Sequence, residues 1–520
     1  MRAVILLMLA AAFWPVQAQV LYGSIVGTVT DPSGGVIQRA TVSITHGGTG
    51  QARTTLTGRD GRYSLPNLAA GRYEIQISAP GFRPLTTAGA EVSINTVTRA
   101  DASLEVGAVT EVITVAAEAT RLRTDQGDLQ YELGGRAIAD LPLPRYRNYQ
   151  HLIDLVPGTT PAAFQNAAVD VPARGLVTWV NGVNRNNNRT KIDGAVNVYI
   201  WLTHHTVYVP PAETIETVNI ATSAFDAEQG MAGGAAITVT TKSGTNDLHG
   251  SAFVFHDNSR FAAKNFFFTE ARKPKSLVNI DGFTWGGPII KNRLFYFGGW
   301  EGTRERVSRN GLFTVPNPDQ RQGDFSAYRT VIYDPTTGNL DGSGRTTFAN
   351  NRIPLARQSA ITRKLQELIP LPNRPGETSA NYFNSGVQEL NRDNFDVKVN
   401  FNRSDRHAIW GKYSRMSAHV VGQPALGVAV GPCLCDGLSG TGETLVQLAA
   451  IGHTMQLSPR FLWDGTISYT RMAQVALGSD YGKNLGLELL GIPGANGSDV
   501  RHSGLPIFNI AGGYTALGEG

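Results

Sequence analysis

A chain of 520 residues is too long for one ordinary domain, and 58 Gly, 26 Pro and only 17% charged residues favour many short strands and turns over long helices. The net charge of +4 is small for this length and the arginines are scattered, which argues against a nucleic-acid partner. We therefore expect two or three units of mostly β structure.

Residues 1–18 have the features of a secretory signal peptide. Arg2 precedes the apolar run Ala3 to Trp14, and Val16-Gln17-Ala18 offers a small-residue cleavage site, so we expect the mature chain to begin at Gln19. The alternative is a short buried helix at the start of a cytosolic protein. No later apolar run approaches the roughly 20 residues that a membrane-spanning helix needs. A membrane location would therefore require a barrel.

Residues 20–106 consist of short alternating stretches separated by Gly and Pro. This spacing predicts a small antiparallel β-sandwich. Asp31-Pro32-Ser33-Gly34-Gly35 and Arg59-Asp60-Gly61-Arg62 have the residue types that tight turns need. The expected strands are Ser24 to Thr30, Thr41 to Thr45, Arg62 to Leu65, Tyr73 to Ser78, Glu91 to Asn95 and Arg99 to Leu104.

Four short sequences in this unit resemble, in their order, the carboxypeptidase regulatory-like domain, a transthyretin-like β-sandwich. The resemblance rests on Gly27 to Asp31, Ala40 to Ile44, Asp60 to Pro66 and Gly71 to Phe82. It implies no peptidase site. It offers carbohydrate binding only as an analogy of fold, and a folded spacer that binds nothing is the equal alternative.

Residues 107–119 form a linker with a short β-prone stretch. The stretch resembles a TonB box, the segment by which the energy-transducing protein TonB recruits a receptor, because an exposed strand can pair with the sheet edge of a partner. The alternative is the last strand of the sandwich. The residues that carry this prediction are Thr110, Glu111, Val112, Ile113, Thr114 and Val115.

Residues 120–245 predict a compact α/β unit. Asn148 to Leu155 is the expected short helix, which Val156-Pro157-Gly158 ends. Leu141 to Gln150, Val180 to Asn188 and Ile192 to Ala195 resemble the plug domain of Oar-like TonB-dependent receptors. The resemblance implies a plug that lies inside a barrel.

The most extensive match to that family joins the plug to the start of the barrel. Gly233 and Gly234 permit close approach of backbones, Ile237 to Thr241 is β-branched strand material, and Ser243 to Asn246 is a polar turn. We call the matching residues the junction motif. They are Gly233, Gly234, Thr241, Lys242, Ser243, Gly244, Thr245, His249 and Gly250.

After Gly250 the pattern changes to longer strands joined by short turns. Residues 394–402 alternate between an apolar and a wet face, and Trp410 and Tyr413 are expected at a bilayer interface. Tight turns near 291, 404 and 458 contrast with the long connections Asn310 to Gln388 and Ala418 to Glu443. A soluble sandwich would share the alternation, but this asymmetry is typical of outer-membrane barrels.

The expected fold is mostly β: an N-terminal β-sandwich, an α/β plug, and the first strands of an antiparallel outer-membrane β-barrel. Residues 246–520 supply about seven wall strands, whereas a plugged transporter barrel has about 22. We therefore expect a partial Oar-like barrel and a chain that is the N-terminal part of a longer protein.

The sequence offers few candidates for chemistry. On an extended segment, His204 and His205 point to opposite faces and cannot share one metal ion. Cys433 and Cys435 would close a strained ring, so we expect a packed turn in an outer loop rather than a disulfide framework or a zinc site. No phosphate-binding loop or nucleophile elbow occurs. We predict no catalytic residue, no metal site and no cofactor.

The resemblance implies a receptor in the outer membrane of a Gram-negative cell that takes up an unknown extracellular ligand. Its implied partners are the TonB-ExbB-ExbD energy-transducing complex and outer-membrane lipid. The main alternative is a non-transporting surface protein for adhesion or glycan binding. A third class, a secreted hydrolase, would need an acid and base arrangement that is not found in the sequence.

Overall fold

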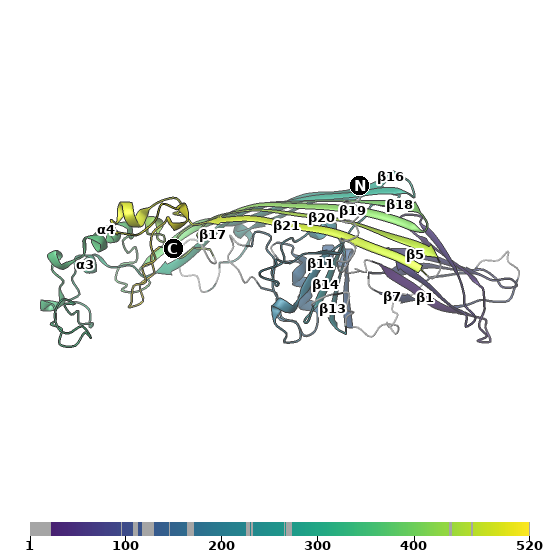
Figure 1. Ribbon diagram of the computed structural model, residues 1–520, viewed down its shortest axis with the longest axis horizontal. Helices are drawn as coiled ribbons and strands as arrows, with labels where there is room; N and C mark the ends of the chain where they lie inside the picture. The colour runs from purple at the N-terminus through teal and green to yellow at the C-terminus, as the bar shows by residue number, and fades with distance from the viewer. Residues whose placement is uncertain are drawn as a thin grey trace, which may run out of the picture.

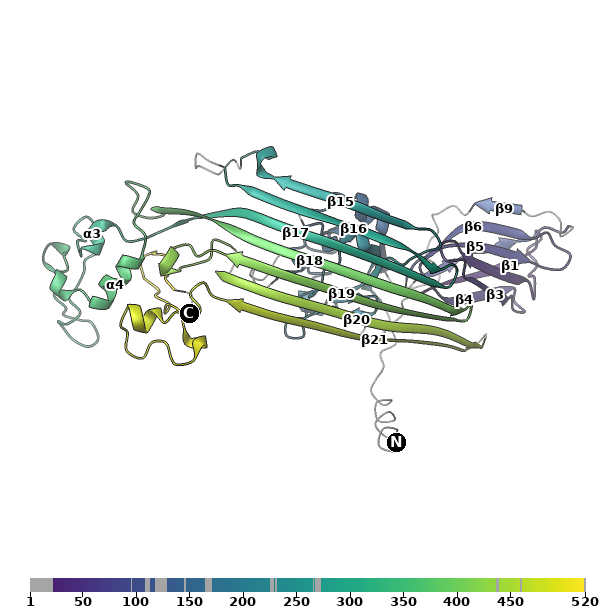
Figure 2. The ribbon, with the colours of Figure 1, turned by 90° about the horizontal axis from the view of Figure 1, so that it is seen from above.

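The molecule is elongated, with a sandwich near one end of a long curved sheet, a plug under the concave face, and loops beyond the other end (Figures 1 and 2). Within the parts described, no helix has the length and apolar character to cross a bilayer. The computed structural model describes residues 22–94, 96–107, 113–116, 129–144, 146–163, 171–224, 229, 232–264, 266, 273–435, 439–458 and 461–518.

The sandwich has two sheets around one apolar core that includes Ile25, Ile44 and Ile75. The predicted strands at 24–30, 41–45, 62–65 and 73–78 are present, whereas β3 and most of β6 were not predicted. The wholly antiparallel pairing was wrong, since β1 pairs in parallel with β7 and β8, and β6 with β9. The strands are β1 (Gly23–Thr30), β2 (Thr41–His46), β3 (Ala52–Leu56), β4 (Arg62–Leu68), β5 (Gly71–Ser78), β6 (Leu85–Val92), β7 (Val97–Arg99), β8 (Ala102–Ser103) and β9 (Ile113–Ala116).

The plug is built on a mixed five-stranded sheet in the order β10-β13-β14-β11-β12. The predicted helix is present as a 3-10 helix, η1 (Tyr149–Leu155), which Asn148 caps by accepting a hydrogen bond from the Gln150 amide. Its buried residues Leu152 and Ile153 join the plug core. The other elements are β10 (Leu129–Gly134), α2 (Gly135–Asp140), η2 (Arg185–Asn187), β11 (Arg189–Ile192), β12 (Ala195–Val196), η3 (Ala212–Thr214), β13 (Ile215–Ser223) and β14 (Ala236–Thr241).

The wall is a seven-stranded antiparallel sheet in which each strand pairs with the next along the chain. Two of its predicted tight turns lie where expected, at 291–293 and 405–406, while residues 459–460 of the third lie outside the described residues. Figure 2 shows the strands side by side over the plug. They are β15 (His249–Asn258), β16 (Ser276–Ile290), β17 (Leu294–Phe313), β18 (Tyr382–Ser404), β19 (His407–Gly422), β20 (Gly440–Ser458) and β21 (Phe461–Leu477).

The longest wall strands extend beyond a bilayer, because a membrane-spanning strand needs only about 9–11 residues and β18 has 23. At the end of the wall away from the sandwich, the connections 314–381 and 423–435 and the segment 478–518 pack around one apolar core, which includes Val315, Leu426 and Leu505. The helical elements there are α3 (Pro318–Arg321), η6 (Ala349–Asn351), η7 (Leu355–Arg357), α4 (Ala360–Leu368), η8 (Gly427–Ala429), η9 (Leu485–Leu489) and η10 (Val500–His502), while η5 (Ser259–Phe261) follows β15.

Three expectations need correction. The polar face of residues 394–402 is not wet, because the plug covers it and buries Asp396 and Lys398. Trp410 does not face a bilayer interface, because it packs inward against the plug core. Cys433 and Cys435 are not merely a packed turn, because their sulfur atoms are joined in a disulfide within the loop after β19.

Candidate functional site at the interface of plug and wall

One carboxylate of the plug is held between two lysines of the wall. Asp193 follows β11 and is buried. Its Oδ1 accepts a hydrogen bond from Lys398 Nζ at 2.9 Å, and its Oδ2 accepts one from Lys412 Nζ, also at 2.9 Å. Because Lys398 lies in β18 and Lys412 in β19, one side chain ties the plug to two neighbouring strands. We call these three residues the plug latch.

The local backbone places the Asp193 carboxylate. Asp193 at φ 42° and Gly194 at φ 80° form the tight turn between β11 and β12, a conformation that Asp and Gly tolerate best. From β14, the Thr241 amide donates to Asp193 Oδ1 at 3.2 Å and the Thr241 hydroxyl to Oδ2 at 2.5 Å. The strand β14 therefore orients the acid for the two lysines.

The latch is ionic. Burial alone would raise the pKa of Asp193, but Lys398, Lys412 and the Thr241 hydroxyl together outweigh it and hold that pKa well below its usual range. The carboxylate therefore stays charged at neutral pH. An ion pair buried this fully depends on both partners, since removing one leaves an uncompensated charge.

Tyr208 of the plug extends the network along the wall. Its hydroxyl donates to Asp396 Oδ2 at 2.6 Å, while the Ser414 hydroxyl donates to Asp396 Oδ1 at 2.6 Å. Lys412 Nζ is 3.6 Å from the same Oδ1. Burial, and then the charge of Asp396, raise the pKa of Tyr208, so the phenol stays a neutral donor. A continuous polar network thus connects Asp193 to Tyr208.

A second cluster lies further along β17 and β18, toward the loop core. Arg392 donates to the plug carbonyl of Ala173 at 3.0 Å and to Glu301 at 3.4 Å. Glu305 accepts a hydrogen bond from the Tyr146 hydroxyl at 2.6 Å. Arg392 and Glu301 both belong to the wall, whereas Glu305 is a wall acid that faces Arg174 of the plug, so the polarity of that contact is the reverse of the latch. The plug is therefore held by ionic and polar contacts at both ends of the interface.

This second cluster is incompletely hydrogen-bonded. Arg174 of the plug is 3.8 Å from Glu305, longer than a hydrogen bond. Among the described residues, Glu301 Oε2, Glu305 Oε1 and Asn394 Oδ1 are buried without a hydrogen-bond partner. A partly satisfied polar network stabilises less than a fully satisfied one. This part of the contact therefore holds the plug less firmly than a paired core would.

The junction motif lies where the chain passes from plug to wall, and two of its glycines are tightly enclosed. A Cβ atom on Gly244 would lie 2.2 Å from the Tyr296 carbonyl oxygen. On Gly250 it would lie 2.3 Å from the Thr284 carbonyl oxygen. No real side chain tolerates such contacts, so these positions need glycine.

The other motif residues are placed by main-chain and short polar contacts. The amides of Gly233 and Gly234 both donate to the Asn187 carbonyl, at 2.8 and 3.2 Å. Thr241 holds Asp193, as described above. The Lys242 amide donates to the Thr214 carbonyl at 2.9 Å, and Thr245 Oγ1 lies 3.2 Å from His249 Nδ1 in a hydrogen bond. The His249 ring stacks on Phe297. Ser243 lines a cavity.

The sandwich touches both the plug and the junction. The Gly48 carbonyl in its β2–β3 hairpin accepts a hydrogen bond from the Asn246 amide at 2.8 Å. Its Ile94 carbonyl accepts one from the Asn219 side chain of β13 at 3.0 Å. Asn246 in turn exchanges two hydrogen bonds of 2.7 Å with the wall turn at Asn292. The sandwich is therefore docked on the hinge between plug and wall.

The structure describes only half of the predicted TonB box and does not decide between the box and a last sandwich strand. Thr110, Glu111 and Val112 lie outside the described residues. Ile113, Thr114 and Val115 belong to β9, which pairs in parallel with β6 at the edge of the sandwich sheet. The backbone therefore has the form of an edge strand, which fits both the box and the alternative of a last sandwich strand.

The remaining candidates have structural partners. His204 Nδ1 hydrogen-bonds Asn186 Oδ1 at 2.6 Å. His205 is buried, and burial followed by the neighbouring His204 lowers its pKa to about 4. In the described parts of the chain, no three His, Cys, Asp or Glu residues gather as metal ligands.

Sequence reasoning missed the latch. Asp193 was noticed only as part of a plug pattern, and Lys398 only as part of a polar face. The available signal was charge on a strand face: a wall strand with both Asp396 and Lys398 pointing inward can pair with charged residues of a plug, although water would serve it equally well. The residues Lys412, Glu301, Glu305 and Arg392 carried the same signal and were also missed.

Comparisons with known proteins agree with this architecture. Residues 240–520, more than half of the chain, match the family described as outer membrane beta barrel domain. Residues 24–105 match the carboxypeptidase regulatory-like domain. The TonB-dependent transporter Oar of Myxococcus xanthus is 24% identical over 370 residues, which are 65% of this chain and 32% of that protein. The chain thus spans about a third of the length of that relative.

Two solved structures also resemble the chain. The siderophore receptor PirA from Acinetobacter baumannii has a TM-score of 0.40 at 13% identity, covering 68% of this chain and 41% of that one. The outer membrane transporter YddB from Escherichia coli has a TM-score of 0.42 at 11% identity, covering 66% and 38%. On the match of residues 240–520, the chain belongs to the outer membrane beta barrel domain family, and its residues 24–105 match a carboxypeptidase regulatory-like domain.

Proposed function

We propose that this chain is part of an energised importer, in which the plug is displaced from the wall to let a ligand cross the outer membrane. The observation that carries the proposal is the polar contact between plug and wall. The plug core continues into apolar wall residues such as Trp410 and Val446, and beside it the plug meets the wall through the ionic latch and through Glu305.

The free energy needed to separate plug and wall differs between apolar and ionic contacts. Separating two apolar faces exposes surface at about 25 cal/mol per Å². Separating buried ions returns them to water, and their hydration offsets much of the lost attraction. The ionic part of the contact is therefore less costly to separate than an apolar contact of the same area would be, which suits a gate.

The segment 109–117 is the proposed point of recruitment. Its described part, β9, is an edge strand, so one side of its main chain faces away from β6. A partner can add a strand at such an edge. The segment also lies between the sandwich and the plug in sequence, so a pull on it reaches the plug directly. The proposed partners are TonB and, through it, ExbB and ExbD.

The test measures binding of the C-terminal periplasmic domain of TonB to the purified protein in detergent. Deleting 109–117 should abolish this binding, and in the complete receptor it should abolish energy-dependent uptake while leaving ligand binding at the surface. Val115→Pro should weaken the binding strongly, because proline removes a main-chain donor. Thr54→Pro, in the opposite edge strand β3, is the matched control. Unchanged binding after the deletion would overturn the recruiting role.

A second candidate function is adhesion or glycan binding without transport. One observation favours it: three outer segments share an apolar core and form a folded platform beyond the wall. A cell-surface assay separates the two functions. Ligand that stays at the surface whether or not the inner membrane is energised would favour adhesion, whereas energy-dependent internalisation would favour the importer.

The signal peptide at 1–18 belongs to the same proposal, since a wall in the outer membrane requires export. Sequencing the N-terminus of the protein isolated from outer membranes tests it. Gln19 is the expected first residue, and an intact Met1 would contradict the prediction.

A further inference from the structure

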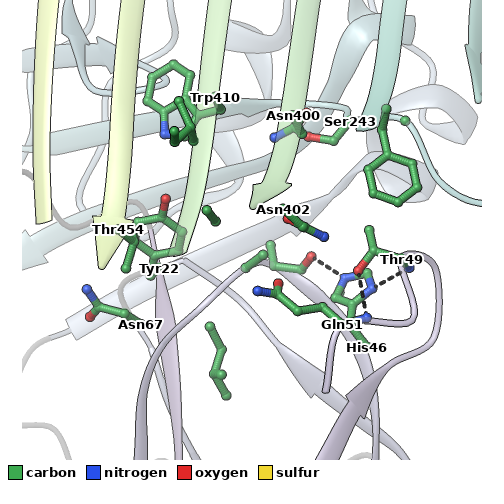
Figure 3. A pocket seen from close by; sticks show the side chains of 18 of the residues that line it. Tyr22, His46, Thr49, Gln51, Asn67, Ser243, Asn400, Asn402, Trp410 and Thr454 are labelled. Atoms are coloured by element: carbon green, nitrogen blue, oxygen red, sulfur yellow. Dashed lines mark hydrogen bonds between the residues drawn. The ribbon is translucent and has the colours of Figure 1, made fainter. Parts of the chain in front are cut away.

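A cavity of about 220 Å³ lies where the sandwich, the plug and the wall meet, at the end of the wall opposite the loop core. Figure 3 shows side chains of the sandwich on one side of it and side chains of wall strands on the other. Asp193 and Lys398 of the latch also line it. Pockets for drug-sized ligands measure about 300–1,000 Å³, so this cavity suits a smaller molecule.

Four side-chain amides face this cavity without a partner. Gln51 and Asn67 come from the sandwich, and Asn400 and Asn402 come from β18 (Figure 3). Within the described part of the chain, none of these four side chains makes a hydrogen bond, and Asn400 Oδ1 is fully enclosed. Enclosed polar groups are normally paired. Since each amide both donates and accepts, the cavity matches a guest that does the same, as a hydroxyl group does.

The charges around the cavity indicate that the guest is neutral. Three of the charged side chains that line it are already engaged: Asp193 with Lys398 at 2.9 Å, and Arg53 with the carbonyls of Pro66 and Asn67 at 2.7 and 3.0 Å. The lining as a whole is balanced, with three acids and three bases. These are Asp193, Glu216 and Asp405, and Arg53, Lys398 and Arg406.

Aromatic side chains supply the apolar part of the lining. Trp410 of β19, Tyr22 and Phe295 all border the cavity. A molecule with a compact carbon ring and many hydroxyl groups would contact the aromatic surface and the amides together. We propose that this cavity binds a small, neutral, hydroxyl-rich molecule of the size of one sugar ring. The site is separate from the outer loops and does not depend on the proposed transport.

Saturation-transfer NMR on the full chain in detergent tests the proposal. The probes are D-glucose, D-galactose and N-acetyl-D-glucosamine, with D-glucose 6-phosphate as the charged comparison. At least one neutral sugar should bind saturably. Gln51→Leu and Asn402→Leu, which lie on different domains, should each weaken it about tenfold, the effect of losing one or two hydrogen bonds. Gln76→Leu, an exposed position on β5, is the matched control and should change nothing.

Three results would each overturn the proposal: no saturable binding of any neutral sugar, wild-type affinity in both cavity variants, or tighter binding of the phosphorylated sugar. Hydrogen exchange of β2 and β18 in the variants distinguishes a lost contact from a lost fold. Binding that disappears while both strands keep their protection supports the site.

Discussion

Arg392 and Asp393 are neighbours in β18, and each forms an ion pair with β17, but on opposite faces of the wall. On the concave face, Arg392 pairs with Glu301, and both side chains are 3% exposed. On the convex face, Asp393 accepts two hydrogen bonds from Arg304, at 2.9 and 3.1 Å, and the side chains are 37% and 42% exposed. The plug covers one pair and not the other.

The two pairs therefore have different consequences. An exposed ion pair stabilises by about 0–1 kcal/mol, whereas removing one partner of a buried pair costs about 3–5 kcal/mol. The wall depends strongly on its inner charges and weakly on its outer ones. A wall whose concave face is covered by a separate plug has this asymmetry, and the four predictions below probe it.

The largest effect is expected for Asp193→Ala. It leaves Lys398 buried without its counter-ion and Lys412 with only Asp396 at 3.6 Å, which should destabilise the docked plug by about 3–5 kcal/mol. Hydrogen exchange of β11 and β14 amides should speed up, while that of the wall strands stays unchanged. Asp405→Ala, in an exposed turn, is the control. If β11 and β14 keep their wild-type protection, the latch does not hold the plug.

A pH effect should follow from His205 in the plug. Its pKa of about 4 in the folded state lies below the value of about 6.5 that an exposed imidazole has, so the neutral form is favoured by about 3 kcal/mol. This contribution is fully present above pH 6.5 and is lost as the pH falls toward 4. The protection of plug amides, corrected for the slower intrinsic exchange at low pH, should therefore fall between pH 6.5 and 4. His205→Gln should flatten that profile, and an unaltered profile would rule out His205 as its source.

A smaller effect is expected at the junction motif. Gly244→Ala would bring a Cβ atom 2.2 Å from the Tyr296 carbonyl oxygen, so the backbone must move, at about 1–3 kcal/mol. Gly411→Ala in β19 is the matched control, since a Cβ there meets nothing within 4 Å. Urea unfolding of the two variants compares them. Equal urea midpoints would mean that the close approach at the junction does not contribute to stability.

The smallest effect is expected for the Arg304–Asp393 ion pair on the convex face of the wall. Arg304→Ala should lower the free energy of unfolding, measured by urea denaturation, by no more than about 1 kcal/mol. Arg392→Ala, one strand away on the concave face, is its counterpart and should cost several times more. Similar losses in the two variants would remove the distinction between the two faces.

Much of the fold was predictable because it depends on local patterns. Alternation over 394–402 gave the two faces of β18, and the short polar turns near 291, 404 and 458 gave the wall hairpins. The glycines at 244 and 250 were identified by their place before the first wall strand. β3 was missed because both of its faces are largely polar or exposed, so it has no apolar alternation to detect.

The candidate site was harder to predict because its partners are far apart in sequence. Asp193 meets Lys398 and Lys412 across 205 and 219 residues, and no local pattern encodes that pairing. A charged strand face has the same sequence whether water or a plug covers it. Trp410 was misplaced for the same reason, since an aromatic residue suits a lipid interface and a buried core equally well.

The central claim is that the plug leaves the wall as a unit when its ionic contacts part. Force spectroscopy on the protein in a bilayer tests this by pulling on the chain at residues 109–117. The account predicts that the plug strands β10 to β14 detach while β15 to β21 stay in the membrane, and that Asp193→Ala lowers the detachment force. Extraction of wall strands before the plug, or a force that Asp193→Ala leaves unchanged, would contradict it.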